Sequence, residues 1–121
     1  GRESLAGPFQ VIALGNGRLV GTGPFYLGCH MDLGPMALVR AGGIDIVVSS
    51  RKQQAADQAM FRHVNAEPAD YRILVLKSSV HFRADFTSLG YEMLIVKAPG
   101  VNTADLRSLK YRRLRAGVDI L

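Results

Sequence analysis

Cysteine is nearly absent from this sequence, which has one, Cys29, among 121 residues. A single cysteine cannot close a disulfide within the chain, so the sequence predicts a protein of a reducing compartment, the cytoplasm. The sequence also lacks any apolar run of the roughly 18 to 20 residues that span a membrane. The chain starts with GRESLAGPFQ, without an initiator Met or a signal-peptide pattern. We therefore expect a segment cut from a longer protein, with no membrane partner.

Signatures of common catalytic sites are missing as well. The chain has neither a G-x-x-x-x-G-K-[ST] phosphate-binding loop nor a G-x-S-x-G nucleophile elbow. Cys29, His30 and Asp32 are possible metal ligands, but neighbouring residues of an extended chain point in opposite directions. No second cluster completes a zinc site, which needs at least three protein ligands. We expect no cofactor in this chain.

Positive charge predominates, because 15 Lys and Arg stand against 10 Asp and Glu and give a net charge of +5. Such a balance attracts anions of several kinds. Four of the basic residues lie in KYRRLR, residues 110–115. A run of this size can bind the nucleic-acid backbone, but no aromatic platform or recognised binding motif accompanies it. We expect this run to be solvated, and we expect no nucleic-acid partner.

The order of apolar segments predicts an α/β fold. Apolar runs around Asn16-Gly17 and around Gly42-Gly43 predict two β-hairpins. Strands then alternate with helices, as is typical of parallel βαβ units. In chain order these strands and helices are residues 44–50, 53–64, 71–79, 80–89, 91–100 and 102–111. The sequence thus predicts a single domain, residues 1–121, in which a mixed sheet of N-terminal hairpins is followed by parallel βαβ units, with helices packed on the sheet.

Helical spacing predicts which side chains of two helices face the core. Ala56, Met60 and Val64 stand at positions i, i+4 and i+8 of the first helix. In the second helix, Phe82 and Phe86 are four residues apart and are expected to be buried. Gly90 follows this helix and is a suitable C-cap.

Hydroxyl groups and basic residues gather where two of the predicted strands end, at Ser49-Ser50-Arg51 and at Lys77-Ser78-Ser79. The carboxyl ends of parallel strands line the usual ligand crevice, and a helix N-terminus that follows suits a carboxylate or phosphate. Alternatively, the serines are N-caps and the basic residues are solvated. The coincidence on one edge favours a site. Its predicted substrate-binding residues are Ser50, Arg51, Lys77, Ser78, His81 and Arg83.

Within the second helix, His81 and Asp85 stand four residues apart, so the carboxylate could orient or charge the imidazole. Arg83 lies about 200° around the helix from His81, so the two cannot face the same point unless one belongs to the unwound first turn. A lone histidine at a helix start is more often a surface or capping group than a catalytic one. Both interpretations of His81 stay open at this level.

The block KSSVHFRADF, residues 77–86, carries the most specific resemblance in the chain. With APGVNTADLRSLKYRRLR behind it and MDLGPMALVRAGGIDIVVSSRKQQAADQAMFRHV before it, the sequence resembles the C-terminal domain of the MlrC family. That family is named for a microcystin-degradation protein. The resemblance covers nearly the whole chain. It implies full-length members that are zinc metallopeptidases acting on small peptides, with the zinc ligands in a larger N-terminal domain that this chain does not contain.

By the same resemblance, Lys77, Ser78, His81 and Arg83 would face the N-terminal catalytic domain and help to form the substrate pocket. We therefore expect an accessory, substrate-facing domain that is inactive alone, with that N-terminal domain and a small peptide as its partners. A different interpretation is a stand-alone anion-binding or protein-interaction module without catalytic activity.

Overall fold

The structure, a computed structural model, describes residues 6–96 and 106–119 of the chain. The chain divides into two compact units, one of residues Gly7–Tyr91 and one of Gly1–Ala6 with Glu92–Leu121. In the second unit, the described part contains one turn of 3-10 helix, η3 (Leu106–Ser108). Leu106 and Leu109, which the sequence placed on one side of a helix, are 47% and 45% exposed there. Residues 102–105 of that predicted helix lie outside the described residues.

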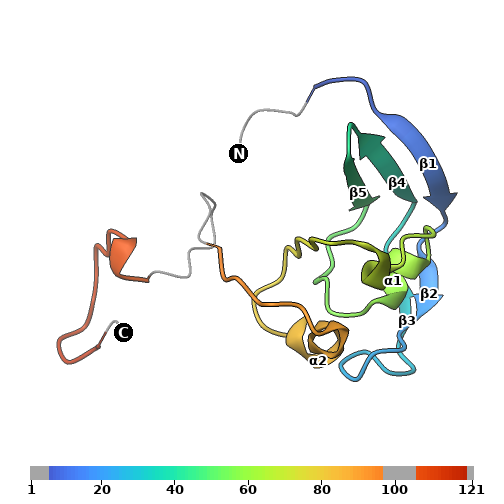
Figure 1. Cartoon of the computed structure of the whole chain (residues 1–121). Helices are drawn as coiled ribbons and strands as arrows, with labels where there is room; N and C mark the ends of the chain where they lie inside the picture. Colours follow the sequence, from blue (N-terminus) through green and yellow to red (C-terminus); the bar gives the residue numbers. More distant parts are fainter. Residues whose placement is uncertain (1–5, 97–105, 120–121) are drawn as a thin grey trace. The chain divides into compact units, whose positions relative to one another are not determined.

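Antiparallel strands form the framework of the Gly7–Tyr91 unit (Figure 1). One sheet has three strands in the order β1–β4–β5, and β2 pairs with β3 in a separate two-stranded sheet. All these pairs are antiparallel. The strands are β1 (Gln10–Gly15), β2 (Arg18–Val20), β3 (His30–Asp32), β4 (Met36–Ala41) and β5 (Ile44–Ser49).

The predicted fold class is therefore wrong, because the described residues contain no parallel βαβ unit. Residues 71–79 and 91–96 were predicted as buried strands but join no sheet, and Ile73 and Val75 are 82% and 87% exposed. Residues 97–100 of the last predicted strand lie outside the described part. The reason for the error is that a short continuous apolar run has no period, so it cannot by itself identify a strand or its partner.

The helices are also shorter than predicted. Among the described residues, two helices consist of single α-helical turns, and the others are 3-10 turns, in which a few residues suffice. The elements of this unit are α1 (Ala59–Arg62), η1 (Pro68–Asp70), α2 (Arg83–Phe86) and η2 (Thr87–Leu89). Gly90 ends η2 in the left-handed conformation, at φ 73° and ψ 13°, as its expected C-cap role requires.

One of the two predicted hairpins is confirmed. β4 and β5 pair directly, with Gly42-Gly43 between them and Gly42 at φ 59°. β1 and β2 flank Asn16-Gly17 as expected, but they pair with β4 and β3 instead of with each other. Gly17 is still required at this corner, because it has φ 72° and a Cβ would lie 1.9 Å from the carbonyl oxygen of Gly34.

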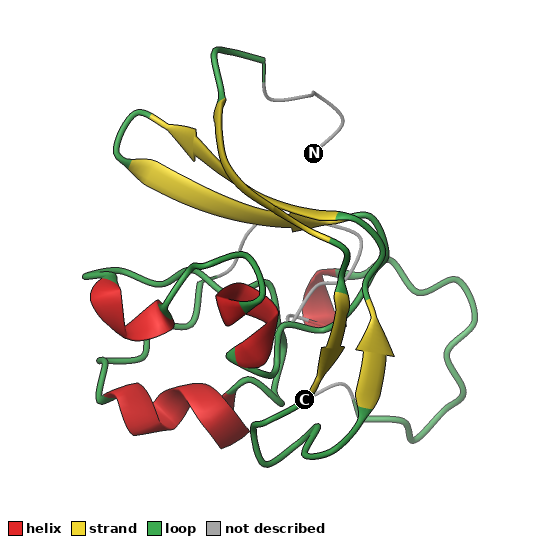
Figure 2. Cartoon of the chain, turned by 90° about the vertical axis from the view of Figure 1, so that its right-hand side faces the viewer, coloured by secondary structure: helices red, strands yellow, loops and turns green. Residues whose placement is uncertain are grey.

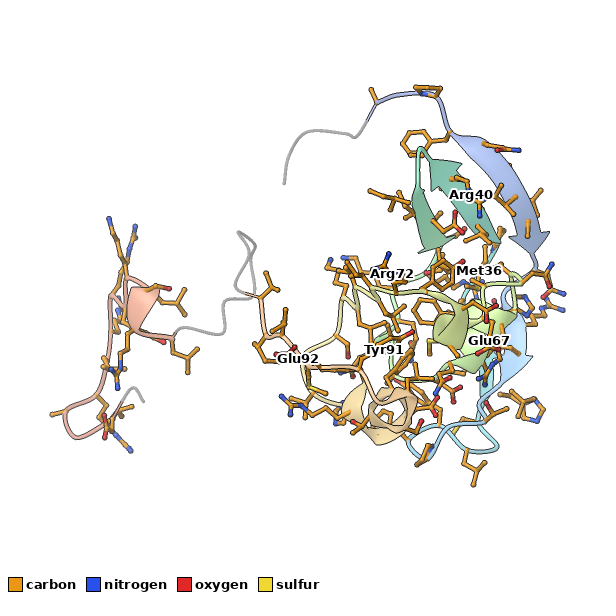
Figure 3. The ribbon with its side chains drawn as sticks, viewed as in Figure 1. Met36, Arg40, Glu67, Arg72, Tyr91 and Glu92 are labelled. Atoms are coloured by element: carbon orange, nitrogen blue, oxygen red, sulfur yellow. The ribbon has the colours of Figure 1, made fainter. Side chains whose placement is uncertain are left out.

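The core lies between the three-stranded sheet and α1, and α1 and α2 lie on the same side of that sheet (Figure 2). Met36 is at the end of β4 nearer α1, and Arg40 lies farther along the strand (Figure 3). Ala56, Met60 and Val64 are at most 4% exposed, so their predicted burial is confirmed, but only Met60 lies in α1 and the predicted helix over residues 53–64 is wrong in length. The buried cluster consists of Leu33, Met36, Leu38, Met60, Val64 and Ala66.

The two phenylalanines of the 77–86 block differ in burial. Phe86 is 5% exposed, and its ring meets that of Phe61 edge to face, with the ring centroids 5.6 Å apart. Phe82 is only partly buried. The expectation of core burial is thus confirmed for Phe86, whereas Phe82 lies nearer the surface.

Asp45 links the three-stranded sheet to the segment that begins at Tyr71. Its carboxylate accepts hydrogen bonds from Arg40 Nη2 at 2.7 Å and from the Tyr71 hydroxyl at 2.9 Å. The hydrogen bond from Arg40 is the main reason why the pKa of Asp45 is lowered, and the bond from Tyr71 adds to it. Tyr91 in turn donates its hydroxyl to the carbonyl of Tyr71.

These contacts predict how stability changes with acid. Because the folded-state pKa of Asp45 is below its unfolded value of about 3.9, its contribution is full above that value and is lost as the pH falls through the folded pKa. The substitution Asp45→Asn should lower the free energy of unfolding at pH 7, and the difference from wild type should shrink below about pH 4. Urea denaturation at pH 7, 5 and 3 measures this.

The control for this experiment is Asp70→Asn, because Asp70 is exposed at the end of η1. That variant should follow the wild-type profile at all three pH values. A constant gap between Asp45→Asn and wild type across the pH range would contradict the assigned role of the Asp45 carboxylate.

Candidate functional site

Gln54 brings two of the predicted site residues together. Its Nε2 donates to Ser78 Oγ at 3.2 Å, and its Oε1 lies 2.9 Å from His81 Nδ1. With the Gln54 amide in this orientation, Nδ1 of His81 is the donor, because an amide oxygen can only accept. Phe25 packs flat on the imidazole, with ring centroids 4.1 Å apart and planes inclined by 13°. We call these four residues, Phe25, Gln54, Ser78 and His81, the His81 cluster.

The other four predicted residues do not join this cluster within the described contacts. Ser50 Oγ donates to the carbonyl of Pro35 at 2.6 Å. Arg51 Nη1 forms an ion pair with Asp32 at 2.7 Å, in which the Arg51 side chain stays 62% exposed. The guanidinium of Arg83 lies over the ring of Phe82, 5.7 Å from its centroid, and Lys77 is exposed.

The structure also corrects the reason for which this site was predicted. Residues 77–79 do not follow a strand, so the two polar stretches do not share one edge of a parallel sheet. The alternative interpretation is wrong about the serines as N-caps, whereas Arg51, Lys77 and Arg83 are exposed, as it expected. The N-cap positions of α1 and α2 are Gln58 and Phe82, neither of which caps with its side chain, and neither Ser50 nor Ser78 stands at a helix start.

Asp85 does not orient His81, contrary to the interpretation of their spacing. Its Oδ2 accepts from the backbone N–H of Gln58 at 2.7 Å, and its Oδ1 accepts from Gln58 Nε2 at 3.2 Å. Asp85 also lies against Gly23, where a Cβ would come within 2.6 Å of its Cγ. The Asp85 carboxylate therefore joins α2 to Gln58 and packs closely against Gly23. The residue that orients the imidazole of His81 is Gln54.

Asp57 is the residue that sequence reasoning missed. It is fully buried and accepts from the backbone N–H groups of Thr22 at 2.9 Å, Gly23 at 2.8 Å and Ala59 at 2.8 Å. The Thr22 hydroxyl donates to it as well, at 3.3 Å. One carboxylate thus fixes both the start of α1 and the loop that carries Phe25 to His81. The available signal was an Asp just before an apolar helical run, which is typical of a capping group, but Asp57 was read as part of the helix.

The described residues do not suit a resident metal. No group of three or more His, Cys, Asp and Glu side chains among them could hold an ion. Asp32, one of the possible ligands noted in the sequence, has its pKa lowered by the backbone N–H of Gly34 and by Arg51, and is engaged by both. The helices of the described segments are too short or too polar to cross a bilayer.

Comparison with known proteins agrees with the family that the 77–86 block suggested. Microcystinase C of Sphingomonas sp is 33% identical over 69 residues, which are 57% of this chain and 14% of that protein. The chain thus spans much less than two thirds of this relative. No solved structure matches. A family model described as MlrC C-terminus matches residues 1–113, so the chain belongs to the MlrC C-terminal family.

Proposed function

We propose that this chain is the accessory, substrate-facing domain of an MlrC-like zinc metallopeptidase that hydrolyses small peptides in the cytoplasm. The His81 cluster carries this proposal. Two of its residues, Ser78 and His81, belong to the block that most resembles the family, and contacts with Gln54 and Phe25 order them at the surface. In this proposal residues 1–121 act as one domain of a longer protein. The zinc and its ligands belong to the N-terminal domain, and the chain alone is inactive.

In this proposal the predicted site residues bind different groups of the substrate. Ser78 and His81 hold fixed positions through Gln54, and they present polar atoms to the substrate pocket. Lys77 and Arg83 are exposed cations suited to a peptide carboxylate. In this proposal Ser50 and Arg51, whose side chain is 62% exposed beside Asp32, belong to the rim of the substrate pocket.

A stand-alone anion-binding or protein-interaction module is the second candidate, favoured by the net charge of +5 and the same exposed basic residues. The coding sequence upstream separates the two proposals. A preceding segment of domain size with His, Asp and Glu zinc ligands supports the enzyme, whereas a complete gene without it supports the module.

The test of the enzyme proposal compares stability with turnover. We expect Arg83→Ala to change the free energy of unfolding of this chain by no more than about 0.5 kcal/mol, because its side chain is exposed. His81→Ala should cost about 1 kcal/mol, because it also loses the ring contact with Phe25 and the hydrogen bond to Gln54. In the full-length protein, each should lower kcat/KM on a panel of short peptides by about 100-fold, since a polar contact to the transition state is lost.

Arg72→Ala is the matched control, because Arg72 is an exposed arginine of the same unit outside the block (Figure 3). It should leave both quantities unchanged. Unfolding of the domain by His81→Ala, or an equal loss of turnover in Arg72→Ala, would show that the block is not a substrate site.

A further inference from the structure

One face of the three-stranded sheet consists only of apolar side chains. Met36 and Leu38 of β4 point into the core, so the alternate residues of β4 point to the opposite side. Cross-strand partners share a face, and the register extends this opposite side to β1 and β5. We call it the outer face. It consists of Val11, Leu14, Ala37, Val39, Ala41, Ile44, Ile46 and Val48.

The outer face is unusual for a solvated surface. An antiparallel sheet with one side in water normally places polar residues on that side. Here α1 and α2 lie on the core side (Figure 2), while Val11, Leu14, Ile44 and Val48 of the outer face are between 47% and 77% exposed. Apolar residues gathered on adjacent strands in this way mark a contact with another protein surface.

A shallow hollow connects the outer face to a proposed substrate residue. Leu14, Ala37 and Val48 line this hollow together with Ser49 and Ser50. A partner that covers the outer face therefore reaches Ser50, which belongs to the proposed rim of the substrate pocket.

We propose that the outer face packs against the N-terminal part of the full-length protein. This inference rests on the proposed function, in which the chain is one domain of a longer enzyme. The matched segment is 14% of Microcystinase C, so such a relative has ample further chain to cover the face. A second copy of this chain fits less well, because each copy carries a net charge of +5 and the copies repel each other.

The test is the rate of thiol labelling at Val48→Cys, compared between the 121-residue chain and the full-length protein. Both proteins carry Cys29→Ser to remove the exposed natural thiol, and mass spectrometry identifies the labelled peptide. We expect labelling at least about tenfold slower in the full-length protein, because a buried thiol is shielded from the reagent. Val20→Cys is the matched control. Val20 is 45% exposed against 47% for Val48 and lies in β2 of the other sheet, so it should react equally fast in both proteins.

Each other outcome has a defined meaning. Equal labelling of Val48→Cys in both proteins overturns the interface and leaves the proposed function standing. Slow labelling of Val48→Cys already in the 121-residue chain also overturns the interface. If this protection increases with protein concentration, a second copy covers the face; if it does not, the chain's own residues cover it. A gene that encodes no further domain removes the proposed function, and this inference falls with it.

Discussion

Replacing Asp57 by alanine should lower the free energy of unfolding by about 3 to 5 kcal/mol, because three backbone N–H groups lose their acceptor. The acceptor is fully buried, and one of its donors, Gly23, is buried with it. Water cannot replace the lost hydrogen bonds without opening the contact between the loop and α1. Urea denaturation of the variant and of wild type measures the difference.

Two comparisons make this result specific to the Asp57 carboxylate. Asp57→Asn keeps one oxygen acceptor and should lose about half as much stability, since it can satisfy only one side of the contact. Asp70→Ala removes an exposed carboxylate and should change stability by no more than about 0.5 kcal/mol. Hydrogen exchange should show that the amides of Thr22 and Gly23 lose protection in Asp57→Ala before the strands open. A loss of less than about 1 kcal/mol, the net worth of a single hydrogen bond, would mean that the carboxylate does not hold the loop.

Phe86→Ala should cost about 3 to 5 kcal/mol, the usual range for a buried phenylalanine. Its ring fills the space beside Phe61, and truncation leaves a cavity there and removes the edge-to-face contact. Phe82→Ala is the natural comparison, because it lies in the same block but is only partly buried. We expect about 1 kcal/mol for Phe82, near the average for point substitutions.

The difference between the two phenylalanines is a direct test of the packing of α2. Thermal and urea unfolding of both variants, measured at equal protein concentration, provide it. Equal losses would indicate that Phe82 is as buried as the sequence suggested, and the position of α2 on the core would then be wrong.

What the sequence predicted correctly is mostly local. The spacing of Ala56, Met60 and Val64 identified three buried side chains, although only Met60 lies within α1. Gly42-Gly43 identified a hairpin, since the turn requires a positive φ within two residues. Gly90 was recognised as a C-cap through the same freedom of conformation.

Strand pairing could not be read in this way, because partners lie far apart in the chain. The pairing of β1 with β4 joins residues that are 21 to 30 positions apart, such as Gly15 with Met36 and Gln10 with Arg40. Alternating strands and helices suggested a parallel sheet, but residues 71–79 lack the periodicity that would have distinguished a strand from an extended segment.

In the candidate site, too, local features were predicted and contacts between distant residues were not. Ser78 and His81 stood out in the sequence because they belong to a polar block, and the structure places both beside Gln54. Gln54 is 27 residues from His81, and Phe25 comes from a loop still farther away, so no local pattern could connect them. Asp57 was overlooked because its partners, Thr22 and Gly23, are 35 and 34 residues distant.

The contact between Gln54 and His81 also determines which chemical groups the exposed imidazole can meet. With its proton on Nδ1 and directed at the Gln54 oxygen, a neutral His81 offers only a lone pair, on Nε2, to an approaching molecule. A peptide N–H or a hydroxyl complements that lone pair, whereas a carboxylate does not. Lys77 and Arg83, the exposed cations of the same block, favour the opposite kind of group, an anion. If the proposed function holds, a bound peptide places an N–H or hydroxyl at His81 and its carboxylate at Lys77 or Arg83.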